Sequence, residues 1–76
     1  MGMYVRLDKL SDDGRLVKYA FAEADGRQRT LIFDREEERV WPEDGNRDGI
    51  FRGATQALAK AWYDRGELPE VVLHQA

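Results

Sequence analysis

The stretch from Asp48 to Gly66 constrains the fold most, because its apolar residues repeat with a helical period. Spaced at about 100° per residue, the apolar side chains gather on one side of a helix: Ile50, Phe51, Ala54, Ala57, Leu58, Ala61 and Trp62. The other side is mostly polar, which is the pattern of an amphipathic helix with one buried face. The rest of the chain therefore has to supply a surface that covers this stripe.

Both ends of the predicted helix carry residues that favour a helix boundary. Asp48 can accept hydrogen bonds from the first free backbone N–H groups, and its charge suits the positive end of the helix dipole. Gly66 can adopt the left-handed conformation that ends a helix, Leu68 can fold back onto the last turn, and Pro69 prevents continuation. Gly53 is the internal exception, and we interpret it as a loosened first turn rather than a close approach of another backbone.

Four segments before the helix alternate apolar and polar residues with a period of two, which is typical of half-buried strands. They are Met3–Leu10, Leu16–Ala24, Arg27–Asp34 and Glu38–Trp41. Turn residues separate them, and Asp25-Gly26 is a strong hairpin signal. The sequence therefore predicts an α+β fold: a four-stranded antiparallel β-meander, one amphipathic helix packed on one face, and a short C-terminal strand at Val71–Leu73.

The pairing of the last strand and the facing of the third strand stay open at the level of sequence. The Val71–Leu73 strand can pair antiparallel with the first strand, parallel with the fourth through a right-handed crossover, or with a second molecule. The third strand can turn either Leu31 and Phe33 or Thr30 and Ile32 toward the helix. We favour Leu31 and Phe33 because of their aromatic content, and Ile32 then lies on the outer face.

The outer face of the predicted sheet is the candidate interaction surface. The second strand lines it with alanines, and the fourth strand can turn either Val40 or Trp41 outward. Tyr4 lies outward beside Arg6, and exposed aromatic residues next to arginines are typical of interface hot spots. The candidate residues are Tyr4, Arg6, Ala20, Ala22, Ile32, Arg39 and Trp41.

The chain has 76 residues and no cysteine, so residues 1–76 are expected to form one small domain without disulfides. A chain of this size buries only about 60% of the surface that it exposes when unfolded. Association with another molecule is a common way to add buried area. We therefore expect a non-enzymatic protein-interaction module, either a homodimer or an accessory partner of another protein, with no cofactor.

The charge pattern bears on the alternative partners. The formal net charge is −3, and basic and acidic residues are interspersed. Single-stranded RNA could stack on outward aromatic side chains, but proteins that bind phosphates usually carry a clustered positive surface. RNA binding is therefore the second hypothesis. No apolar run approaches the roughly 20 residues of a bilayer span, and no secretory pattern begins the sequence, so a cytoplasmic location is expected.

Residues 44–49, Asp-Gly-Asn-Arg-Asp-Gly, resemble the first half of the EF-hand calcium loop. The resemblance implies calcium ligands at Asp44, Asn46, Asp48 and the backbone carbonyl of Ile50. The twelfth position departs from the pattern, because Thr55 replaces the bidentate glutamate. We therefore interpret the segment as a polar turn that caps the helix, with calcium binding as a third hypothesis.

His74 is the only histidine of the chain, and no serine or second histidine lies at a catalytic spacing from it. A general base needs a partner within hydrogen-bond reach. The sequence also lacks a glycine-rich phosphate loop. No catalytic residue is therefore predicted.

Overall fold

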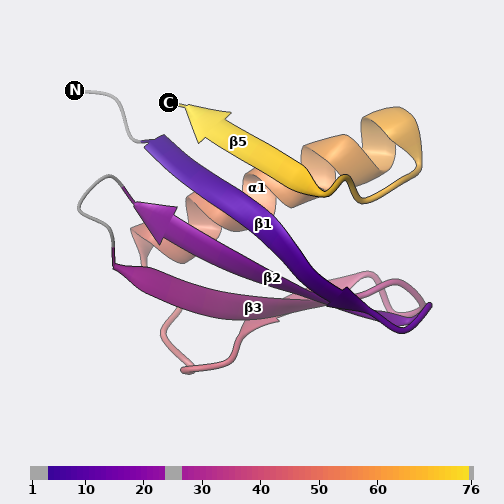
Figure 1. Ribbon diagram of the computed structural model, residues 1–76, viewed down its shortest axis with the longest axis horizontal. Coiled ribbons are helices and arrows are strands. Elements are labelled where there is room, and N and C mark those ends of the chain that lie inside the picture. The colour runs from indigo at the N-terminus through magenta and orange to yellow at the C-terminus, as the bar shows by residue number, and fades with distance from the viewer. Residues whose placement is uncertain (1–3, 24–26, 76) are drawn as a thin grey trace.

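The structure, a computed structural model, describes residues 4–23 and 27–75. Its elements in chain order are β1 (Tyr4–Asp12), β2 (Leu16–Glu23), β3 (Gln28–Asp34), β4 (Arg39–Pro42), α1 (Gly49–Arg65) and β5 (Val71–Gln75). The strands form one antiparallel sheet of five strands in the order β4-β3-β2-β1-β5. Helix α1 packs against one face of this sheet (Figure 1). The predicted α+β fold is confirmed.

Strand β5 takes the first of the three pairings that the sequence left open. It runs antiparallel to β1, from the Asp8–Val71 pair to the Tyr4–Gln75 pair. In Figure 1, β5 and β1 lie side by side, and α1 passes behind them. The C-terminal strand thereby becomes one edge of the sheet, and β4 becomes the other.

The core lies between α1 and the sheet face that carries the aromatic side chains. The predicted choice of Leu31 and Phe33 is confirmed, because they are 0% and 3% exposed. The other buried residues of this cluster are Val5, Leu7, Val17, Tyr19, Phe21, Phe51, Ala54, Ala57, Leu58, Leu68 and Val72. The inward-facing residues of the strands thus pack against the apolar stripe of α1. This agrees with the strand period of two and the helical period of the sequence. Burial of this apolar area from water is the main force that holds α1 on the sheet.

The helix begins and ends where its caps predict. The carboxylate of Asp48 accepts a hydrogen bond from the Phe51 backbone N–H at 3.0 Å. Gly66 has a φ of 70°, and its N–H donates to the Trp62 carbonyl at 2.8 Å. Leu68 is buried against the core. Within residues 4–23 and 27–75, no helix combines the length and apolar character needed to cross a bilayer.

Several boundaries differ from the prediction by one or two residues. Strand β1 continues through Asp12, with a register shift between Lys9 and Ser11 that absorbs one extra residue. Strand β4 includes Pro42, which an edge strand tolerates. Glu38 lies in the preceding turn with a φ of 53°. The predicted Asp25-Gly26 hairpin turn lies outside the described residues.

Candidate functional site

One face of the sheet has no described helix or loop packed over it. Helix α1 lies on the far side of the sheet in Figure 1, so the near face is open. We call this surface the open face. The most exposed large apolar residues of the strands are Leu73, Leu10 and Val71, at 54%, 53% and 44%. Leu10 lies at the register shift of β1, whereas the register with β1 places Leu73 and Val71 on the open face. In register, Leu73 lies opposite Arg6 of β1, and Val71 lies opposite Asp8.

The register places the predicted surface residues on the open face. Arg6 lies opposite Ala22, and Ile32 lies opposite Trp41. The remaining three residues, Tyr4, Ala20 and Arg39, continue the same alternation along their strands. Of the two choices for β4, the outward one is Trp41, because Val40 pairs with the buried Phe33.

The members of this surface differ in how much area they offer to a partner. Tyr4 is 41% exposed, whereas Ile32 and Trp41 are half-buried. Ala20 is only 2% exposed, between Asp8 and Thr30 on the adjacent strands, so a partner gains almost no contact area from it. The apolar area of the open face therefore lies mainly toward the strand ends and toward β5.

Polar side chains on the open face are paired with one another. The Arg6 guanidinium donates to the Asp8 carboxylate at 3.0 Å. The Glu43 carboxylate accepts from the Thr30 hydroxyl at 2.6 Å and lies 3.0 Å from the Lys18 ammonium. These two contacts, the Thr30 hydroxyl first, lower the pKa of Glu43. These charges are thus compensated locally, whereas Arg39 on the same face forms no ion pair with another described residue.

Val71 and Leu73 were not among the residues predicted for the surface. The sequence indicated a short strand there, but three apolar residues in a row carry no alternation that tells which side chains face the core. Pairing with β1 decides the faces: Val72 lies opposite the buried Leu7, which sends its two neighbours to the open face. The facing of Val71 and Leu73 therefore depends on a tertiary contact, the pairing of β5 with β1, which the sequence of this segment alone does not indicate.

A groove of about 490 Å³ runs between α1 and β5 on the other side of the sheet. Its helical wall includes Gln56, Lys60 and Asp64, which are spaced by four residues and so share one side of α1. His74 also lines the groove, and its Nε2 atom is buried without a hydrogen-bond partner in the structure. The groove therefore borders the free edge of β5.

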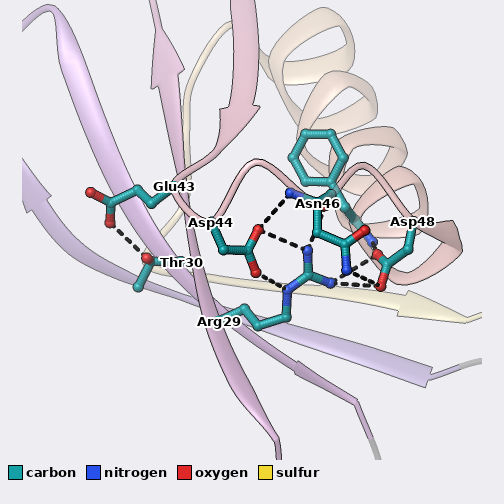
Figure 2. Close-up of polar contacts among 7 residues, drawn as sticks. Arg29, Thr30, Glu43, Asp44, Asn46 and Asp48 are labelled. Carbon is teal, nitrogen blue, oxygen red and sulfur yellow. Dashed lines mark hydrogen bonds and ion pairs between the residues drawn. The ribbon is translucent and has the colours of Figure 1, made fainter.

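The segment that resembles a calcium loop is held by Arg29 of β3 (Figure 2). The Arg29 guanidinium donates to the Asp44 carboxylate at 2.8 and 3.2 Å and to the Asp48 carboxylate at 2.8 and 3.0 Å. It also donates to the Asn46 carbonyl at 2.6 Å. The Arg29 guanidinium thus lies at the position that the EF-hand resemblance would give to calcium. The described residues contain no group of three or more side chains suited to holding a metal ion.

The electrostatics of this Arg29 cluster follow from its geometry. Hydrogen bonds from Arg29 are the main reason that the pKa values of Asp44 and Asp48 are lowered. Backbone N–H groups, from Asn46 and Phe51 respectively, lower them further. The pKa of Arg29 is raised in turn, chiefly by Asp44. All the groups of the cluster therefore keep their charges at neutral pH.

The Arg29 cluster positions the beginning of α1. The Arg29 side chain is 12% exposed, and its guanidinium lies 4.8 Å from the centre of the Phe21 ring. One cation therefore contacts the core, the loop after β4 and the helix cap. The alternation along β3 puts Arg29 on the same face as Leu31 and Phe33. The acidic partners of Arg29 carry no such local signal.

Comparison of the chain with protein families, curated proteins and solved structures finds no match. Inference about function therefore starts from the surfaces described above.

Proposed function

We propose that the protein is a non-enzymatic interaction module that self-associates through the surface formed by the open face and β5. The observation that carries the proposal is the placement of Leu73 and Val71, which are 54% and 44% exposed on an uncovered sheet face. Large apolar side chains grouped at an uncovered sheet surface are typical of protein-interaction sites. A second copy of the chain is always present in solution, and we therefore propose it as the partner.

Two further features support self-association. The chain is small, and α1 covers only one side of the sheet, so association would add buried apolar area to a modest core. On the open face, Arg6 is already paired with Asp8, and Lys18 is paired with Glu43. A partner that covers them therefore does not have to supply a compensating charge.

The RNA hypothesis gains less support from the same surface. Recognition of phosphates needs cations that are available to the ligand. Four of the arginines, Arg6, Arg15, Arg29 and Arg35, instead form ion pairs with carboxylates of this chain. RNA binding stays a prediction of the sequence, and we do not develop it further.

The test is the molar mass of the wild-type chain and of Leu73→Lys, measured by light scattering after size exclusion. We expect the wild type to be a dimer and the variant to be a monomer, because association would bury the lysine charge in an apolar contact. Tyr63→Lys is the matched control, since Tyr63 is 74% exposed on α1, away from the open face. A wild-type monomer at high micromolar concentration would contradict the proposal.

A further inference from the structure

The two edges of the sheet differ in how well they are protected against pairing with another strand. Strand β4 has four residues and ends at Pro42, which has no backbone N–H to donate. Strand β5 has the sequence Val-Val-Leu-His-Gln, with no proline, lysine or carboxylate. Edge strands are normally protected by such residues. The β5 edge lacks them and is therefore suited to pairing.

The hydrogen bonds of β5 show which backbone groups are free. The Lys9 N–H donates to the Glu70 carbonyl at 2.8 Å, so the backbone groups of Glu70 face β1. Residues along a strand alternate in direction, so Val72 and His74 also face β1. The N–H and C=O groups directed at the free edge belong to Val71, Leu73 and Gln75.

We propose that two copies of the chain pair antiparallel along β5, on a twofold axis at Leu73, to form one continuous sheet. This inference rests on the proposed self-association and specifies its geometry. The axis places Leu73 opposite Leu73 and Val71 opposite Gln75 of the other copy. These residues are the ones with free N–H and C=O groups, so the register forms about six hydrogen bonds, two for each facing pair.

The side chains fit a second copy on both faces of the joined sheet. On the open face, the exposed Leu73 meets Leu73 of the other copy, and the exposed Val71 lies opposite Gln75 of that copy, so no charged residue lies between them. On the other face, His74 and Val72 of each strand lie next to the groove of about 490 Å³ beside α1. The same strand therefore provides both the edge and the side chains that border the groove.

The charges along the groove wall are complementary under twofold symmetry. Lys60 and Asp64 lie one helical turn apart on this wall, and neither forms an ion pair with another described residue. A copy related by a twofold axis presents the same wall in the reverse direction. A contact between Lys60 of one copy and Asp64 of the other would therefore occur twice, as every contact in an isologous interface does.

A proline at the axis tests this geometry because it removes an outward N–H and no bond to β1. We expect Leu73→Pro to elute as a folded monomer, and Leu73→Ala, which keeps the N–H, to remain a dimer. Ile32→Glu alters the open face on β3, away from β5, and should also remain a dimer. Molar mass comes from light scattering, and circular dichroism checks that each variant is folded.

Amide hydrogen exchange of the wild type is an independent test of the β5 pairing, and it applies even if Leu73→Pro does not fold. The proposal predicts protected amides at Val71, Leu73 and Gln75, with protection that falls on dilution. A dimer in which these amides exchange rapidly, or in which Leu73→Pro stays dimeric, would overturn the β5 pairing. If Ile32→Glu is monomeric while Leu73→Pro is a dimer, the copies stack through the open face, and self-association itself stands. A monomeric wild type would overturn both proposals.

Discussion

The guanidinium of Arg29 and the carboxylate of Asp48 are joined by hydrogen bonds of 2.8 and 3.0 Å, and this contact fixes the start of α1 to β3. The same carboxylate accepts from the Phe51 N–H and caps the helix. One pair of side chains thus caps α1 and joins its first turn to β3. The first three predictions concern this pair.

Replacing Arg29 should lower the free energy of unfolding. Arg29→Gln removes hydrogen bonds to two carboxylates, and hydrogen bonds to charged groups contribute about 1.5–3 kcal/mol each. Both carboxylates remain accessible to water, so we expect a total loss of about 1–3 kcal/mol in urea denaturation. Arg52→Gln makes the same change on the exposed side of α1 and should cost less than about 0.5 kcal/mol. Equal effects of the two substitutions would contradict this role for Arg29.

Acid should remove the stability that the Arg29 cluster provides. The folded pKa values of Asp44 and Asp48 are lowered, so their contribution is complete above the unfolded value of about 3.9. It is lost as the pH falls from there through the folded pKa values. The difference in stability between the wild type and Arg29→Gln should therefore narrow below about pH 4. A constant difference across that range would contradict the assignment.

Calcium should leave the thermal midpoint of the wild type unchanged. Stabilisation by a ligand requires a site in the folded state, and the Arg29 guanidinium already lies between the carboxylates of Asp44 and Asp48. Thermal unfolding in calcium and in a chelator should give the same midpoint. A midpoint that rises with calcium would restore the EF-hand interpretation of residues 44–49.

Alkaline pH should destabilise the fold through Tyr19. Burial is the main cause that raises the pKa of its phenol, followed by the charge of Glu70. The hydroxyl also donates to the Pro69 carbonyl. Because the folded pKa is raised, this contribution is present below the unfolded value of about 10 and is lost as the pH rises above it.

Tyr19→Phe provides the comparison for the alkaline effect. The variant should lose about 1 kcal/mol at neutral pH, because the hydrogen bond to Pro69 is absent. Its unfolding free energy should fall less steeply above about pH 10, since that side chain no longer titrates. Parallel curves for the two proteins in urea denaturation would show that the Tyr19 phenol does not contribute.

Local signals in the sequence predicted the helix and the strand faces. Asp48 and Gly66 bound α1 through short-range hydrogen bonds, and the alternation around Phe33 depends only on the pleat of one strand. These features depend only on residues that are close together in the sequence. The structure therefore agrees with them to within one or two residues.

Features that depend on distant contacts were not predictable in the same way. The partner of β5 follows from the path of α1 across the sheet, and the outward position of Leu73 follows from that partner. Arg29 contacts acidic residues 15 and 19 positions further along the chain, which only the folded loop brings near it. Ala20 has the predicted facing, but its burial depends on side chains of two other strands.

The most direct test of self-association is the molar mass of the unmodified protein by sedimentation equilibrium, from low to high micromolar concentration. The monomer has a mass of 8.8 kDa. We predict that the weight-average mass rises with concentration and levels off at twice the monomer value. A mass that stays at 8.8 kDa throughout the series would contradict the central claim that the open face and the β5 edge bind a second copy.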